Sequence, residues 1–219
     1  MVRLIVFDCD GTLVDSQHGI IEAMGQAFVA RGLAPPSGAS VRRTVGLSLP
    51  LAMAALHPEG DGDAHARLVA AYRAAFLALR ARPAHREPLF AGAREAIEAL
   101  GAAGYLLGIA TGKSRRGLRA TLDRTGLAAR FVTLQTADDA PSKPHPAMLE
   151  RAMNEAGVEA AETVLVGDTT FDIEMARAAG VGALGVGWGY HEPGELLASG
   201  ADAVVASFAE LVETIGLGP

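Results

Sequence analysis

The sequence contains a single cysteine, Cys9, among 219 residues. One thiol cannot form an intramolecular disulfide, which excludes a disulfide-stapled secreted fold and fits a reducing cytoplasm. No uninterrupted apolar run reaches the roughly 20 residues that a transmembrane helix needs, so we expect no membrane span. An excess of positive charge is also missing: the formal net charge is −6, and the 19 Lys and Arg residues are scattered. The negative net charge and the lack of a basic cluster argue against a nucleic-acid-binding surface.

The first residues carry no secretory signal either. Met1-Val2-Arg3 leads directly into an apolar strand, with no small-residue cleavage site. We therefore expect a cytoplasmic protein. Half of the residues are hydrophobic (50%), which is enough for one large core or for a core and a smaller second domain. The composition leaves the oligomeric state open.

The most informative stretch is an apolar run that ends in two acids. Leu4–Phe7 has the unbroken hydrophobicity of a parallel strand that is buried on both faces. Asp8 and Asp10 follow it, and side chains two residues apart on an extended chain point to the same side. Gly11-Thr12 is a turn signal that ends the strand. Two carboxylates at the end of a core strand require a cation or a proton, so we expect a functional site there.

The residues after this strand indicate an inserted helical segment. Between residues 16 and 86 the pattern predicts helices only, at about 16–32, 41–45, 49–56 and around Leu68–Leu79. We expect Asp15-Ser16 to cap the first of these helices.

From residue 89 onward helices and strands alternate. The expected elements are helix 91–102, strand 105–110, helix 114–124, strand 131–134, helix 146–156, strand 163–166, helix 170–179, strand 183–186, strand 203–205 and helix 208–215. Such alternation predicts an α/β fold with a Rossmann-like, doubly wound parallel sheet covered on both faces. The first strand joins this sheet, so we predict a core of residues 1–15 and 87–219 with an inserted all-helical domain at 16–86.

Polar side chains follow the predicted strands of this core. In an open parallel sheet, ligands bind beyond the carboxyl ends of the strands. Thr111-Gly112 follows the second strand and opens a helix, whose N–H groups attract phosphate. Lys143 precedes the next helix, and Asp168 and Asp172 follow the fourth strand. Together with the acids of the first strand, these are the groups that phosphoryl transfer requires.

In their order along the chain, these four motifs resemble those of the haloacid dehalogenase superfamily of phosphotransferases, over the whole core. The resemblance implies that Asp8 is the nucleophile and Asp10 the general acid/base. It implies phosphate binding by Thr111, Gly112 and Lys143. Asp168 would be a metal ligand, and Asp172 would orient the lysine or the waters of the metal. Mg²⁺ prefers oxygen ligands, and Asp8, the backbone C=O of Asp10 and Asp168 are the expected set.

Two further stretches are similar to the phosphoglycolate-phosphatase-like group of this superfamily. They are Ala137-Asp138-Asp139 and Gly187-Trp188-Gly189-Tyr190-His191. The helical insert resembles the type-one cap of the family. This narrower resemblance implies Mg²⁺-dependent hydrolysis of a small phosphorylated metabolite, with phosphoglycolate as the leading candidate, through an aspartyl-phosphate intermediate. Arg43, on a short helix of the insert, is our candidate for contacting the carboxylate of the substrate.

Two other functions stay open on the same scaffold. A sugar-phosphate mutase of the β-phosphoglucomutase type uses the same core and also needs Asp10. A binding or regulatory protein without catalysis is the second alternative, because a fold does not fix a function. Hydrolytic dehalogenation is disfavoured, since displacing a halide from carbon has no use for the metal ligands or for Asp10.

Overall fold

The computed structural model describes residues 1–216, and its centre is a six-stranded parallel sheet. The strands are β1 (Leu4–Phe7), β2 (Leu106–Thr111), β3 (Thr133–Thr136), β4 (Thr163–Gly167), β5 (Gly182–Val186) and β6 (Ala203–Val205), in the spatial order β3-β2-β1-β4-β5-β6. In the register, Phe7 lies beside Ile109 on one side and Val166 on the other. The strand order reverses at β1 and β4, which is where such sheets bind ligands. Asp8 leaves the sheet at this point.

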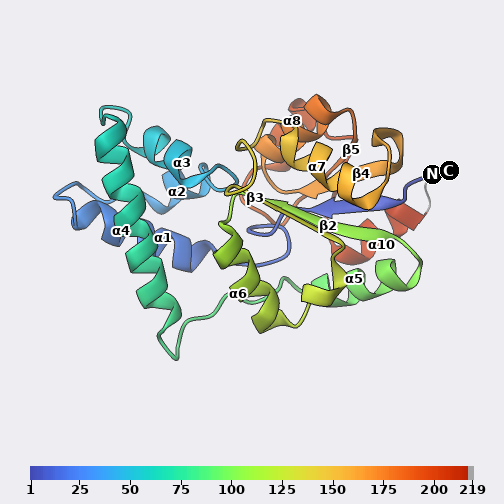
Figure 1. Ribbon diagram of the computed structural model, residues 1–219, viewed down its shortest axis with the longest axis horizontal. Helices are drawn as coiled ribbons and strands as arrows, with labels where there is room; N and C mark the ends of the chain where they lie inside the picture. The colour runs from blue at the N-terminus through green and yellow to red at the C-terminus, as the bar shows by residue number, and fades with distance from the viewer. Residues whose placement is uncertain (217–219) are drawn as a thin grey trace.

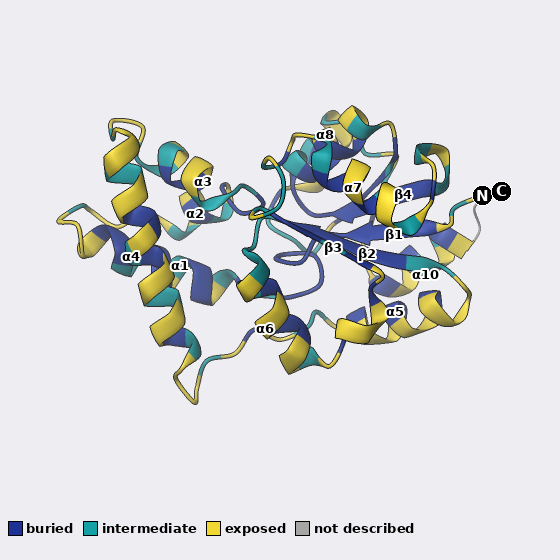
Figure 2. Cartoon of the chain, in the orientation of Figure 1, coloured by how far each residue is buried: buried dark blue, intermediate teal, exposed yellow. Residues whose placement is uncertain are grey.

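Two layers of helices cover the sheet (Figure 1). α5 (Ala93–Ala102), α6 (Arg115–Thr125) and α10 (Phe208–Gly216) share a hydrophobic cluster with Ile5 and Phe7. α7 (Ala147–Ala156), α8 (Thr170–Ala179) and α9 (Pro193–Ala198) share a second cluster with Leu4 and Val6. Successive side chains of a strand point to opposite faces, so the apolar run of β1 supplies both clusters. Figure 2 shows the strands as the most deeply buried part of the chain.

Four helices form a separate helical unit between β1 and α5. They are α1 (Gln17–Val29), α2 (Gly38–Arg42), α3 (Leu49–Leu56) and α4 (Gly62–Arg80), and they lie beside the sheet in Figure 1. The unit has its own hydrophobic cluster, which includes Met24, Phe28, Met53 and Leu68. The predicted fold class, an α/β core with an inserted all-helical cap, is confirmed.

The two chain segments that join the helical unit to the core are paired with each other. Asp15 N donates to Pro88 O at 2.9 Å, and Phe90 N donates to Leu13 O at 3.0 Å. Beside this pairing lies the buried carboxylate of Glu87. It accepts hydrogen bonds from Arg80 of α4 at 3.1 Å and from Arg124 of α6 at 2.6 Å. The carboxylate therefore ties the helical unit to the core at their junction.

Several element boundaries differ from the prediction. The short helix expected at 41–45 is α2, at Gly38–Arg42, because Ser37 Oγ accepts from Ser40 N at 3.0 Å and caps it earlier. The strand expected at 131–134 is β3, at Thr133–Thr136, because a 3₁₀ turn over Ala128–Arg130 precedes it and Phe131 packs into the core. α9 was not predicted. No helix within residues 1–216 is long and apolar enough to cross a membrane.

Candidate active site

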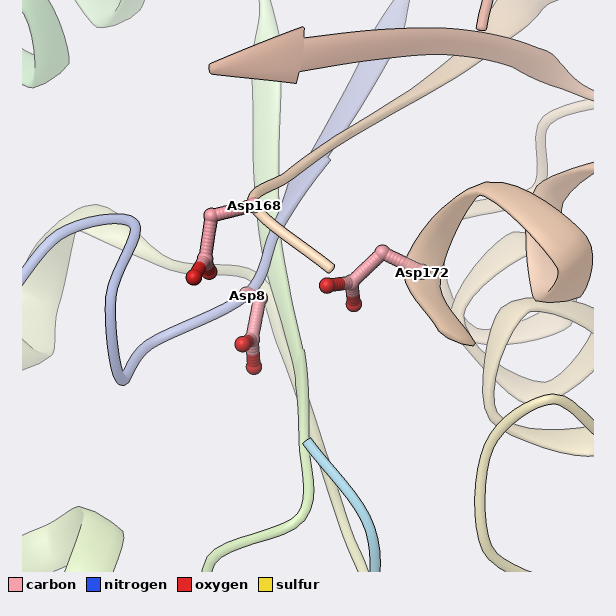
Figure 3. Close-up of side chains that lie close together, drawn as sticks. All are labelled: Asp8, Asp168 and Asp172. Carbon is pink, nitrogen blue, oxygen red and sulfur yellow. The ribbon is translucent and has the colours of Figure 1, made fainter. Parts of the chain in front are cut away.

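Three carboxylates converge beyond the carboxyl ends of β1 and β4 (Figure 3). Asp8 directly follows β1, Asp168 directly follows β4, and Asp172 lies in the first turn of α8. One oxygen from each residue lies within 4.8 Å of the others. All three side chains are buried. The neighbouring positions of β1 and β4 in the sheet bring together residues that are 160 or more positions apart in the sequence.

The carboxylate of Asp8 is buried and only partly partnered. The Lys143 ammonium lies 2.8 Å from its Oδ1, and no donor among the described residues reaches its Oδ2. Burial raises the pKa of Asp8 to about 6, against the opposing charge of Lys143. A buried carboxylate oxygen without a donor needs a cation or a substrate to complete its surroundings. This unpartnered oxygen is the feature of the site that most directly indicates chemistry.

Lys143 lies between Asp8 and Asp172. Its ammonium Nζ is 2.5 Å from Asp172 Oδ1, to which it donates a hydrogen bond, and 2.8 Å from Asp8 Oδ1. Burial alone would lower the pKa of Lys143, but the charges of Asp172 and Asp8 outweigh burial and raise it. The other oxygen of Asp172 accepts from Thr169 N and Oγ1, at 3.0 and 2.7 Å. Asp172 is thus fully engaged in holding the lysine and the start of α8.

Asp168 is held in place by the turn that follows β1 and by the segment after β5. Thr12 Oγ1 donates to its Oδ1 at 2.7 Å, and Tyr190 N donates to its Oδ2 at 2.9 Å. Gly11 has a φ of 86°, and a Cβ there would overlap the Asp168 carboxylate. Glycine is therefore required at this turn for both its conformation and its lack of a side chain.

The charges of this group fit a divalent cation. Burial, followed by the charges of Asp8 and Asp172, raises the pKa of Asp168 well above its usual range. Lys143 supplies one positive charge to three carboxylates. Carboxylate oxygens are the ligands that hard divalent cations prefer. Asp8 and Asp168 can hold such an ion. Asp172 is the least available of the three, because its Oδ1 accepts from the Lys143 ammonium and its Oδ2 accepts from both Thr169 N and Thr169 Oγ1.

Asp10 lies next to Lys113, a lysine that was not predicted to belong to the site. Lys113 Nζ donates to Asp10 Oδ1 at 2.5 Å, and Ser16 Oγ donates to the same oxygen. Ser16 stands at the N-cap position of α1, as predicted, but its side chain makes no capping hydrogen bond. The prediction that Ser16 caps α1 is therefore wrong for its side chain, because the hydroxyl donates to Asp10 instead. The tripeptide Thr111-Gly112-Lys113, at the end of β2, was the signal in the sequence that could have identified the lysine.

A cavity of about 540 Å³ separates the helical unit from the carboxyl edge of the sheet. Residues of the core that line it include Asp8, Asp10, Thr111, Gly112 and Lys113. The helical unit contributes mostly apolar side chains, among them Met24, Val45, Leu49, Tyr72 and Phe76. Lys143, Asp168 and Asp172 lie outside this lining and are fully buried. Of the residues selected from the sequence, the structure thus brings all those of the four core motifs to one region.

Arg43 lies apart from this region. Its Nη1 is 2.6 Å from Oε2 of Glu195, and both side chains are partly exposed. Arg43 is not among the residues that line the cavity. The Arg43 guanidinium, at the end of α2, thus pairs with α9 at the surface. The structure does not bring it to the carboxylates of Asp8, Asp168 and Asp172.

Comparison with known proteins gives consistent matches over the chain. A family model described as haloacid dehalogenase-like hydrolase matches residues 5–186. A probable phosphatase of Dickeya dadantii, IndB, is 37% identical over 97% of this chain and 93% of its own length. A phosphoglycolate phosphatase of Rhodospirillum rubrum is 36% identical over 99% of this chain and 92% of its own length. A crystal structure of a hydrolase from Pseudomonas syringae is 26% identical, with a TM-score of 0.87 over 99% of this chain and 98% of that chain.

Proposed function

The chain belongs to the haloacid dehalogenase-like hydrolase family, and from this premise we propose that it is a phosphatase of small phosphorylated metabolites. The observation that carries the proposal is the buried carboxylate of Asp8, which lines the cavity and whose Oδ2 has no donor among the described residues, while the Lys143 ammonium lies 2.8 Å from its Oδ1. Phosphoglycolate is the leading candidate substrate, because relatives that are 34 to 36% identical are named phosphoglycolate phosphatase.

Asp8 acts as the nucleophile in this proposal. Its free oxygen attacks phosphorus, the new Asp–O–P bond forms, and the ester P–O bond breaks. Water then attacks the phosphorus of the aspartyl-phosphate and regenerates the carboxylate. Lys143, the Thr111 hydroxyl and the N–H groups that follow it stabilise the charge on the phosphoryl oxygens. Asp172 holds Lys143 in position for this role.

Asp10 is the general acid and base of the two steps. Asp10 gives a proton to the oxygen of the leaving alcohol and later takes one from the attacking water. Its place supports this assignment, because Asp10 lines the same cavity as Asp8. Although β1 ends at Phe7 and the chain bends at Cys9, both carboxylates line the cavity and can reach one substrate there.

Asp8, Asp168 and the backbone C=O of Asp10 are the residues that would hold Mg²⁺. When bound, Mg²⁺ supplies the positive charge that allows a carboxylate to approach a phosphate dianion. The unpartnered Oδ2 of Asp8 and the pKa of Asp168, raised by burial and by its neighbouring carboxylates, support this choice of site.

The helical unit is the cap that selects the substrate, with residues 16–86 as its proposed extent. It covers the cavity with apolar side chains, so a bound substrate is enclosed between cap and core. Enclosure excludes bulk water and limits the size of the leaving group. Small phosphorylated acids are therefore favoured over phosphoproteins. Arg43 remains a proposed contact to a substrate carboxylate only if cap movement releases it from Glu195.

Hydrolysis of an aryl phosphate and of phosphoglycolate, each with and without Mg²⁺, tests the proposed function. We expect phosphate release that depends on Mg²⁺ and a higher kcat/KM for phosphoglycolate. Interconversion of sugar phosphates without phosphate release would favour the mutase alternative. No turnover of any phosphate ester, with or without Mg²⁺, would favour a binding protein.

A further inference from the structure

Lys113 and Ser16 both donate to one oxygen of Asp10. Lys113 Nζ donates to Oδ1 at 2.5 Å, and Ser16 Oγ donates to that same atom. No hydrogen bond reaches Oδ2 from any residue in the described range 1–216. The Asp10 side chain is 10% exposed and lines the cavity. The two donors therefore hold one carboxylate oxygen and leave the other for a ligand in the cavity.

Asp10 is the main partner of both donors, since the only other side-chain hydrogen bond of the Ser16 hydroxyl among the described residues is a longer one, 3.4 Å, to the Tyr190 hydroxyl. The Lys113 side chain is 9% exposed, and Asp10 is the acceptor of its ammonium. A lysine held this far out of water is unusual for a residue that serves only solubility. Ser16 occupies an N-cap position without making the capping hydrogen bond that serine usually makes there. Helix α1 therefore lacks the capping hydrogen bond, and the Ser16 hydroxyl donates to Asp10 instead.

We propose that Lys113 is a positioning residue for the acid–base step: with Ser16 it holds Oδ1 of Asp10, so that Oδ2 exchanges the proton. This inference rests on the proposed phosphatase function. Asp10 Oδ2 gives its proton to the ester oxygen as the P–O bond breaks, and later takes a proton from the attacking water. A general acid must lie within hydrogen-bond reach of the atom that it protonates, so the orientation of the carboxylate limits the rate.

The fixed position of Lys113 comes from the backbone around it. Its N–H donates to Thr111 Oγ1 at 3.3 Å, and its C=O accepts from Ala137 N at 3.2 Å. The preceding Gly112 packs so closely on the carbonyl of Gly46 that a Cβ would lie 2.6 Å from it. The lysine is thus anchored in the loop after β2, from which its side chain reaches Asp10.

A double-mutant cycle between Lys113 and Asp10 tests the proposal. We expect Lys113→Met to lower kcat/KM for an alkyl phosphate at least ~10-fold, with a smaller loss for an aryl phosphate that leaves without a proton. In the Asp10→Asn background the same substitution should change kcat/KM less than about twofold, because residues that act through one another are not additive. Lys113→Arg, which keeps a donor, should recover part of the loss.

Arg119→Met is the matched control, since Arg119 is an exposed cation on α6 that does not line the cavity. It should leave kcat/KM unchanged. If Lys113→Met fails to fold, Ser16→Ala gives a second cycle with Asp10→Asn and the same expectation.

Additive losses in the cycle would overturn the proposal. So would a loss confined to the KM of an anionic substrate, which would make Lys113 a substrate contact. An unmodified chain that hydrolyses no phosphate ester would instead overturn the proposed function, and the role of Lys113 with it.

Discussion

The ammonium of Lys143 bridges two buried carboxylates, lying 2.8 Å from Oδ1 of Asp8 and 2.5 Å from Oδ1 of Asp172. Asp8 thus has a neighbouring positive charge at Oδ1, while its Oδ2 has no donor among the described residues. This arrangement suits a carboxylate that must bind a cation and attack a phosphorus atom, and it has measurable consequences for stability.

Asp8→Asn should stabilise the metal-free protein at neutral pH. The pKa of Asp8 is raised to about 6 by burial, so its charge destabilises the folded state. The pKa of Asp8 is therefore higher in the folded protein than its value of 3.8 in the unfolded chain. Asp8 contributes stability in full below pH 3.8, and this contribution is lost as the pH rises through about 6. Thermal unfolding at pH 7.5 should show a gain on the order of 2 kcal/mol. At pH 4 the gain should vanish, and Asp123→Asn, an exposed control, should have no effect at either pH.

Mg²⁺ should stabilise the protein, and more strongly at pH 7.5 than at pH 5. Protons compete with the cation for Asp8, whose pKa is about 6. The rise in Tm with added MgCl₂ reports binding to the folded state. We expect this rise to shrink at pH 5 and in Asp8→Asn. An equal rise at both pH values would place the cation elsewhere.

Asp10→Asn should slow turnover in a manner that depends on the leaving group. An amide cannot donate the proton of a carboxylic acid, so alkyl phosphates should lose ~10² to 10⁴ in kcat. Aryl phosphates, whose leaving group departs without a proton, should lose less. Mg²⁺ binding should be retained, because the backbone C=O is the proposed ligand. Equal losses for both classes of ester would argue against the acid role.

Glu87→Gln should destabilise the junction between cap and core. Burial alone would raise the pKa of Glu87, but Lys113, Arg80 and Arg124 outweigh it and lower the pKa. Removing a buried partner of two guanidinium groups costs about 3 kcal/mol. Because the pKa of Glu87 is lower in the folded protein than its usual value of 4.5, Glu87 contributes stability above pH 4.5, and this contribution is lost on acidification.

Denaturant unfolding of Glu87→Gln should therefore differ from the parent at pH 7, and the difference should decrease below about pH 4.5. Glu98→Gln is the control, because that side chain is exposed and its nearest cations are 3.9 and 4.0 Å away. A difference that persists undiminished at low pH would show that the glutamate charge is not responsible.

The core motifs could be predicted from the sequence because each is a local pattern. A buried parallel strand reads as an apolar run, and the residue after it lies at the carboxyl edge of the sheet. Asp8 and Asp168 could thus be placed near each other without a structure. Asp172 followed from its position in the first turn of the next helix.

The side-chain partners could not be predicted, because they join residues far apart in the chain. Arg43 was selected as a cation on the helical unit, but its partner is Glu195, more than 150 positions away. Ser16 was expected to cap α1, and its hydroxyl reaches Asp10 instead. Lys113 had a local signal in its place after β2, but nothing nearby in the sequence indicated that Asp10 would be its partner.

Mapping a trapped phosphoryl group is the decisive test of whether Asp8 is the nucleophile. The protein would be mixed with substrate and Mg²⁺, quenched in acid within one turnover, digested, and examined by mass spectrometry. We expect the mass of one phosphoryl group on the peptide that contains Asp8, and no such adduct in Asp8→Asn. Phosphate release at the full rate by Asp8→Asn, or a phosphoryl group trapped on another residue, would contradict this expectation.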